Sequence, residues 1–220
     1  MKMHRVALGM ALLLGAGMAQ AGDFSVGLTG SSLGVGGEVG YAISERFRVR
    51  AAGYALKFGY DGTRGDVDYH ADLKLASGGL FLDWHPFAGG FRISLGGFAN
   101  GNNLKATGQP QGGQYTINGV TFTAAEVGAL TGKAELNSTA PYLGLGWLFG
   151  AGPKGGLGVS LDAGVLYQGS PKVTLTSTGG TQSGNPILQS NLDAEARKFE
   201  DDIKVLRFYP AISLGLVYRF

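Results

Sequence analysis

The chain contains no cysteine, so no disulfide framework can stabilise it or reveal its compartment. After residue 21 it also lacks any run of about 18 apolar residues, which a membrane-spanning helix requires. Charge of neither sign dominates, with 18 Lys and Arg against 16 Asp and Glu. Because a nucleic-acid partner requires a basic surface, we expect none. Two features are abundant instead: 40 glycines without a collagen-like period, and apolar residues that alternate with polar ones.

The first 21 residues have the three parts of a secretory signal peptide. Lys2 and Arg5 supply the positive start, residues 6–18 are apolar, and Ala19-Gln20-Ala21 is an A-x-A cleavage site. An uncleaved anchor is the alternative, but the apolar stretch is short for a spanning helix of about 20 residues. We therefore predict a signal peptide over residues 1–21 and one outer-membrane domain over 22–220. Removing Lys2 and Arg5 leaves 16 basic residues against 16 acidic ones.

The last stretch, residues 205–220, alternates between apolar and small or polar side chains with a period of two. This pattern is typical of a strand that faces lipid on one side and the lumen of an outer-membrane β-barrel on the other. The stretch ends on Tyr218 and Phe220, an aromatic end that we expect the barrel-assembly machinery to recognise. Similar alternation occurs over residues 33–43, 47–60, 67–84, 91–105, 132–149 and 157–175.

These seven segments are joined alternately by short and long connections, as expected of periplasmic turns and extracellular loops. A chain that begins and ends in the periplasm must cross an even number of times, so we add the weaker segment 24–30 as an eighth strand. The predicted fold is all-β, an eight-stranded antiparallel transmembrane β-barrel of a Gram-negative outer membrane. Within residues 47–60, Tyr54, Leu56 and Phe58 depart from the outward-facing row, which predicts a β-bulge.

The long connections are expected to carry structure of their own. Residues 115–122 form a predicted β-hairpin whose Asn118-Gly119 turn suits type I′ geometry. Thr123 and Glu126 have the spacing of a capping box, which predicts a short helix up to about residue 130. Apolar residues at helical spacing over residues 192–203 predict a further helical segment.

Charged residues occupy many of the positions that the alternation directs into the lumen. Such charges must be paired or hydrated, because a desolvated single charge is costly. An ion-paired plug that holds the barrel closed is one interpretation, and a polar conduit whose pairs separate for a small solute is the other. The predicted lumen residues are Glu38, Arg48, Arg50, Asp83, Arg92, Asp162, Arg207 and Arg219.

Acidic residues concentrate in the segments predicted to lie outside the cell. An acidic mouth would concentrate cationic solutes at low ionic strength. A merely solvated helix or hairpin face is the alternative, because mixed charges at these spacings are common on exposed helices. The residues of this predicted mouth are Asp61, Asp66, Asp68, Asp72, Asp193, Glu195, Glu200, Asp201 and Asp202.

Asp68, His70 and Asp72 share one face of a predicted strand above the membrane. A divalent metal or an Asp-His proton relay could use this spacing. A solvated outer hairpin is the simpler explanation, because no nucleophile and orienting group lie at a matching spacing. We therefore predict neither an enzyme, nor a cofactor, nor a resident metal.

The segments TINGVTFTAAEVGALTGKAEL, APYLGLGW, GVLYQGSPKVTLT and FYPAISLGLVYRF resemble the CarO family of small outer-membrane barrels, named for carbapenem susceptibility and described as ornithine-type porins. The resemblance covers about residues 114–220. It implies an eight-stranded barrel with structured outer loops and the passage of small solutes, basic amino acids among them. The named family member ends on Trp, whereas this chain ends on Phe220. No substrate-binding residue is carried over from the family.

Together these features predict a small porin-like channel for passive uptake of small polar solutes, with cationic amino acids such as ornithine as candidates. The alternative is a non-conducting barrel that reinforces the membrane or binds a partner through its loops. The expected partners are outer-membrane lipid and lipopolysaccharide, periplasmic chaperones, the barrel-assembly machinery and small polar solutes.

Overall fold

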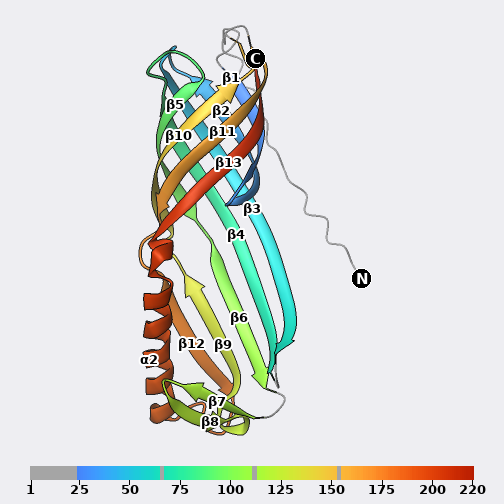
Figure 1. Cartoon of the computed structure of the whole chain (residues 1–220), viewed down its shortest axis with the longest axis vertical. Helices are drawn as coiled ribbons and strands as arrows, with labels where there is room; N and C mark the ends of the chain where they lie inside the picture. The colour runs from blue at the N-terminus through green and yellow to red at the C-terminus, as the bar shows by residue number, and fades with distance from the viewer. Residues whose placement is uncertain (1–23, 65–66, 111–112, 153–154) are drawn as a thin grey trace.

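The computed structural model describes residues 24–64, 67–110, 113–152 and 155–220. The predicted signal peptide and Asp66 lie outside the described residues. Figure 1 shows an elongated molecule with a barrel at the end that carries the C-terminus, and a sheet with a long helix at the other end.

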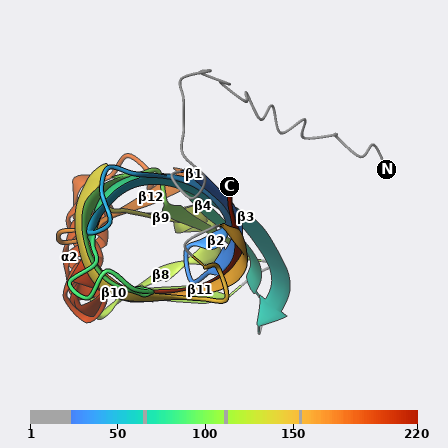
Figure 2. The same ribbon diagram turned by 90° about the horizontal axis from the view of Figure 1, so that it is seen from above.

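The barrel consists of eight antiparallel strands, and Figure 2 shows them arranged in a ring. The last strand pairs with the first from Ser25–Arg219 to Ser31–Ser213, which closes the sheet on itself. The predicted fold class and the eighth strand are therefore confirmed. The barrel strands are β1 (Phe24–Ser31), β2 (Gly34–Ala42), β3 (Phe47–Arg64), β4 (Val67–Trp84), β5 (Phe91–Asn100), β10 (Thr139–Phe149), β11 (Gly156–Tyr167) and β13 (Phe208–Arg219).

The barrel wall continues beyond the ring on one side only. The far halves of β3 and β4 pair with β6 (Asn103–Pro110), β9 (Gly128–Glu135) and β12 (Lys172–Gly179) in the order β12-β9-β6-β4-β3. This five-stranded extension, hereafter the extracellular sheet, continues the strands of the barrel, because β6 follows β5, β9 precedes β10 and β12 follows β11. The three predicted strands 91–105, 132–149 and 157–175 are therefore each divided where the wall leaves the barrel.

The predicted bulge in β3 is wrong. The register of β3 with β4 runs without interruption from the Phe47–Trp84 pair to the Arg64–Val67 pair. Tyr54 faces the lumen, and Leu56 and Phe58 follow it on the same face of the strand. The chain does not switch faces there; the inner side of the wall changes from polar to apolar as β3 leaves the barrel.

A helix and a hairpin complete the extracellular part. The helix α2 (Pro186–Asp202) lies along β12, and the hairpin of β7 (Gln114–Ile117) and β8 (Val120–Thr123) lies at the end of the extracellular sheet, with α1 (Ala124–Val127) next to it (Figure 1). The buried residues that hold these elements together are Ile117, Phe122, Val127, Leu188 and Leu192.

The predicted loop structure is confirmed in kind and corrected in extent. Asn118 and Gly119 have φ values of 52° and 80°, as a type I′ turn requires. Thr123 and Glu126 form the predicted capping box, but α1 stops at Val127 because Gly128 begins β9. The helical segment predicted over residues 192–203 starts earlier, where Asn185 caps the first turn of α2 through Ile187 N. No helix among the described residues is long and apolar enough to cross a membrane.

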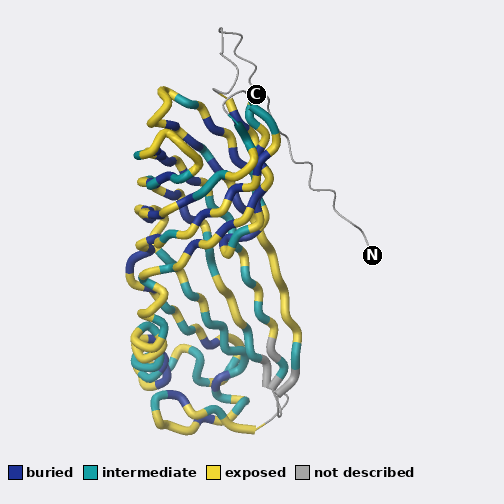
Figure 3. The backbone as a smooth tube through the Cα atoms, turned by 45° about the horizontal axis from the view of Figure 1, so that its top comes forward, coloured by how far each residue is buried: buried dark blue, intermediate teal, exposed yellow. Residues whose placement is uncertain are grey.

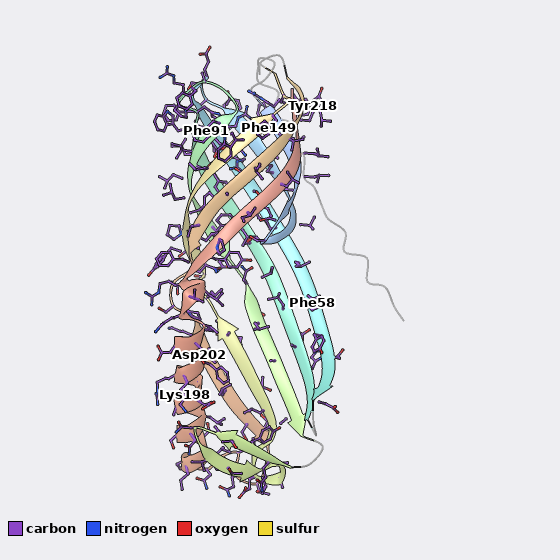
Figure 4. The ribbon with its side chains drawn as sticks, viewed as in Figure 1. Phe58, Phe91, Phe149, Lys198, Asp202 and Tyr218 are labelled. Atoms are coloured by element: carbon purple, nitrogen blue, oxygen red, sulfur yellow. The ribbon has the colours of Figure 1, made fainter. Side chains whose placement is uncertain are left out.

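The outside of the barrel is apolar and exposed, whereas the inside is buried (Figure 3). Leu28, Leu80 and Leu157 on the outer face are 75%, 66% and 64% exposed. Aromatic residues gather at the end that carries the C-terminus, where Figure 4 labels Phe91, Phe149 and Tyr218. An apolar band edged by aromatic rings is the surface of a membrane barrel, so the chain is an integral barrel of the outer membrane.

Close packing of β2 on β3 depends on a glycine. A Cβ atom at Gly36 would lie 1.8 Å from the carbonyl oxygen of Gly53, whereas one at Gly97 on the outer face of β5 would meet nothing within 4 Å. We predict that Gly36→Ala destabilises the barrel by about 1–3 kcal/mol, as expected of an overpacked site, and that Gly97→Ala changes stability by less than about 1 kcal/mol. Urea unfolding in detergent, followed by circular dichroism, measures both. Equal midpoints for the two variants would contradict the close packing.

Candidate functional site

The centre of the lumen is a buried guanidinium that contacts three carboxylates. Arg50 on β3 donates from Nε to Asp83 at 2.9 Å, from Nη1 to Glu38 at 3.1 Å and from Nη2 to Asp162 at 3.4 Å. These four residues come from β3, β4, β2 and β11, and none is more than 7% exposed. The pairing satisfies charges that could not be buried singly.

A second arginine extends this network around the barrel wall. Arg92 on β5 donates to both carboxylate oxygens of Asp162 at 2.8 Å and to Ser160 Oγ at 2.9 Å. Ser94 donates to Asp83 at 2.6 Å, and Arg48 donates to Ser25 Oγ at 2.6 Å. Hereafter Glu38, Arg48, Arg50, Asp83, Arg92 and Asp162 are called the charged layer.

Aromatic rings cover the charged layer on its extracellular side. Phe81 lies edge-on to Phe98 and Tyr142, with ring centroids 5.2 Å and 5.3 Å away, and Tyr54 lies 6.3 Å from Phe98. The guanidinium carbon of Arg50 lies 4.6 Å from the centroid of Phe81, so the two layers are in direct contact. Hereafter Tyr54, Phe81, Phe98 and Tyr142 are called the aromatic layer.

The two layers leave almost no free space between them. A cavity of about 10 Å³ is lined by members of both layers together with Ser31, Leu33, Ala211 and Ser213. This volume holds about one water molecule. As Figure 2 shows, the strands form a ring around the lumen, but side chains fill its interior. At the level of these two layers, buried side chains occupy the lumen.

Six of the eight predicted lumen residues lie together in the charged layer. Arg219 is half-buried and lies beside the charged layer, because it pairs across the sheet with Ser25, which accepts a hydrogen bond from Arg48. Arg207 is not on a strand: it ends a 3-10 helix, η1 (Lys204–Arg207), and its Nη2 donates to Ser170 Oγ at 3.1 Å. The alternation assigned it to the lumen because residues 205–207 resemble a strand, whereas β13 begins at Phe208.

The aromatic layer was not among the predicted site residues. The sequence does indicate that two of its members face inward. Phe81 and Tyr142 occupy inward positions of the alternation, and the next inward residues are Asp83 and Gly144. What could not be read from the pattern is that rings from β3, β4, β5 and β10 meet at one level, since that requires the register between strands.

The acidic residues predicted at the mouth do not share one surface. Asp61, Asp68 and Asp72 lie on the far halves of β3 and β4. The five acidic residues predicted in the last third of the chain lie on α2, where Figure 4 labels Asp202: Asp193, Glu195, Glu200, Asp201 and Asp202. Glu195 accepts from Asn118 N at 3.0 Å, and Glu200 accepts from Val173 N at 2.8 Å. These two carboxylates attach α2 to the hairpin and to β12, so their role is structural. Asp193, Asp201 and Asp202 are exposed.

His70 lies between two carboxylates on the outer face of the extracellular sheet. Its Nδ1 contacts Asp61, its Nε2 lies 3.1 Å from Asp72 Oδ2, and the side chain is 55% exposed. Asp61 was not predicted in this cluster; the register of β3 with β4 places it directly opposite His70. Among the described residues, no three His, Asp or Glu side chains are placed to hold a metal ion.

The arrangement matches solved structures of an outer-membrane protein of Acinetobacter baumannii. No protein-family profile and no curated protein matches the sequence. The crystal structure of Acinetobacter baumannii CarO superposes with a TM-score of 0.57 at 21% identity, covering 89% of this chain and 97% of that one. CarO2 from the same organism gives 0.57 at 19% identity, covering 92% and 100%. The fold is that of CarO. The barrel and structured loops that the sequence resemblance implied are therefore confirmed.

The charged layer yields a stability prediction. Arg50→Met removes the guanidinium and leaves three buried carboxylates without their shared partner. Breaking a buried pair in this way costs about 3–5 kcal/mol, which we expect as a lower urea midpoint in detergent. Arg46→Gln, on an exposed periplasmic turn, removes the same charge and serves as the control. If the midpoint of Arg50→Met equals that of Arg46→Gln, the ion-pair network does not stabilise the folded barrel.

The His70 cluster yields a pH prediction. The hydrogen bond to Asp61 and the charges of Asp61 and Asp72 raise the pKa of His70 above its ordinary value of 6.5. Since the folded pKa is the higher one, the contribution to stability is complete below pH 6.5 and is lost as pH rises through the folded pKa. Proton NMR titration of His70 should give a pKa above 6.5, and Asp61→Asn should lower it. An unchanged pKa in Asp61→Asn would contradict the pairing.

Proposed function

We propose that this protein is a closed outer-membrane barrel that anchors an extracellular binding sheet and does not itself pass solutes at rest. The observation that carries the proposal is the pair of layers in the lumen, with a free volume of about one water molecule.

Opening the lumen would be energetically costly. A solute must separate Arg50 from carboxylates on three other strands, and it must also move the rings of Phe81 and Tyr142. Separating one buried partner from such a network costs about 3–5 kcal/mol, and moving packed rings adds to that. These terms favour a barrel that is closed most of the time.

The extracellular sheet has the features of a binding surface. Beyond the Val35–Ala55 pair, the described residues of β3 are paired with β4 on one side only, so Leu56–Arg64 present a free strand edge. On the inner face, Phe58 and Tyr60 are 60% and 59% exposed. An extended peptide with alternating apolar side chains would complete both the hydrogen bonds and the apolar contact. Figure 1 shows this edge on the side opposite α2.

Uptake of small polar solutes is the second candidate function. The observation that favours it is the environment of Arg50, a cation surrounded by the carboxylates of Glu38, Asp83 and Asp162. A cationic amino acid such as ornithine carries the charge that these carboxylates bind and could exchange with the guanidinium. Under this alternative the charged layer is a selective constriction that opens transiently.

Liposome uptake distinguishes the two functions. We predict that the reconstituted wild-type protein admits ornithine, lysine, glycine and an anionic solute within about twofold of a protein-free control, because both layers block the lumen. Replacing Phe81, Phe98 and Tyr142 by alanine should raise uptake, whereas replacing the outward Leu80, Leu95 and Leu143 by alanine should not. Uptake of ornithine or lysine several-fold above the anionic solute by the wild-type protein would overturn the closed-barrel proposal in favour of transport.

A further inference from the structure

Lysines are concentrated at one level of the outer wall, just beyond the barrel. Five of the eight lysines that follow residue 21 lie on the outer face of the extracellular sheet, and all five are exposed. Hereafter they are called the lysine belt: Lys57, Lys74, Lys105, Lys133 and Lys172.

The strand register places these lysines side by side. Lys57 on β3 lies directly opposite Lys74 on β4, and the same row continues through Asn103 and Glu135 to Lys172. One step further from the barrel, Lys105 on β6 lies directly opposite Lys133 on β9. Like charges that face each other across a strand pair are unfavourable, so each facing pair is a site where a bound anion would relieve repulsion.

The belt begins where the lipid-facing surface ends. On the outer face of β3 and β4, the Lys57–Lys74 pair is followed toward the barrel by the pair Ala55–Ala76. On β11 the last outward residue is Tyr167, whose ring lies 5.3 Å from that of Phe208, and Lys172 opens the strand that follows. The lysines therefore lie at the level of the headgroups of the outer leaflet.

Few acidic side chains offset this charge. Lys133 pairs with Glu135 at 2.7 Å, and Asp72, which lies opposite Lys105, is also held by His70 at 3.1 Å. Five lysines and these two carboxylates leave a formal charge of +3 on the two rows, while basic and acidic residues balance over the chain after residue 21. The excess is thus local to this level of the wall.

We infer that the lysine belt binds the phosphate groups of lipopolysaccharide in the surrounding outer leaflet. Ammonium groups form charge-assisted hydrogen bonds with phosphate, and a row of them across a curved wall matches several phosphates at one depth. This contact would fix the depth and rotation of the barrel in the membrane and order the lipid around the extracellular sheet. The inference does not depend on whether the lumen conducts.

The test measures binding of fluorescent lipopolysaccharide to the purified full-length protein in detergent. The wild-type protein should bind intact lipopolysaccharide at least tenfold more tightly than enzymatically dephosphorylated lipopolysaccharide, with the difference shrinking as salt rises. Replacing Lys57, Lys74, Lys105 and Lys133 by glutamine should make the two affinities equal. The matched control replaces four exposed cations elsewhere, Arg46, Arg197, Lys198 and Lys204, by glutamine and should bind as the wild type does.

Three results would overturn the inference: tight binding retained by the belt variant, an equal loss in the control, or no preference of the wild-type protein for intact over dephosphorylated lipopolysaccharide. A thermal shift with inorganic phosphate as large as that with lipopolysaccharide would also overturn it, since the belt would then be a general anion site. If the fourfold variant does not fold, the pairs Lys57→Gln with Lys74→Gln and Lys105→Gln with Lys133→Gln are measured separately, each expected to lose at least threefold.

Discussion

The ion pairs of Arg50 are the interaction on which the rest of the structure depends. One guanidinium joins β3 to carboxylates on β2, β4 and β11, on both sides of the ring. In an eight-stranded barrel the lumen is just wide enough for side chains, so this network is also the filling of the barrel. The same contacts therefore hold the strands together and exclude solutes. A barrel of this size cannot widen its lumen without giving up part of its own core.

The extracellular sheet follows from the way this barrel ends. β1, β2 and β13 have no counterpart in the extracellular sheet, while β3, β4 and the strands that continue β5, β10 and β11 extend into it. A closed wall thus becomes a half-open one, and its inner face passes from the charged layer through the aromatic layer to Leu56 and Phe58. Its apolar face is covered by α2 near β12 and left exposed near β3.

Much of this could be predicted from period-two alternation, because alternation depends only on which face a residue takes. Alternation directs Glu38, Asp83 and Asp162 inward, and all three side chains are buried in the structure. Their common partner could not be predicted, since it depends on the stagger between strands. The predicted bulge near Tyr54 was wrong because alternation separates the two faces of a strand without saying which one is the inner face. In the membrane the outer face of β3 is apolar, whereas beyond the barrel its inner face is apolar. This reversal resembles a change of face in the sequence, although the register is unbroken. The start of the last strand was predicted at residue 205 instead of Phe208, because a 3-10 turn can share the composition of a strand end.

β3 shows how one strand serves several environments without changing its fold. Its outward row passes from lipid at Val49 to the headgroup level at Lys57 and to Asp61 beside His70. Its inward row passes from Arg50 through Tyr54 to Phe58 over the same length. Since the register with β4 is unbroken, a shift of β3 by one residue would bring Arg50 onto lipid and Val49 into the charged layer. The buried charge network and the apolar belt thus specify the same register from opposite sides of the wall, which explains how the long β3–β4 pair keeps its alignment far beyond the barrel.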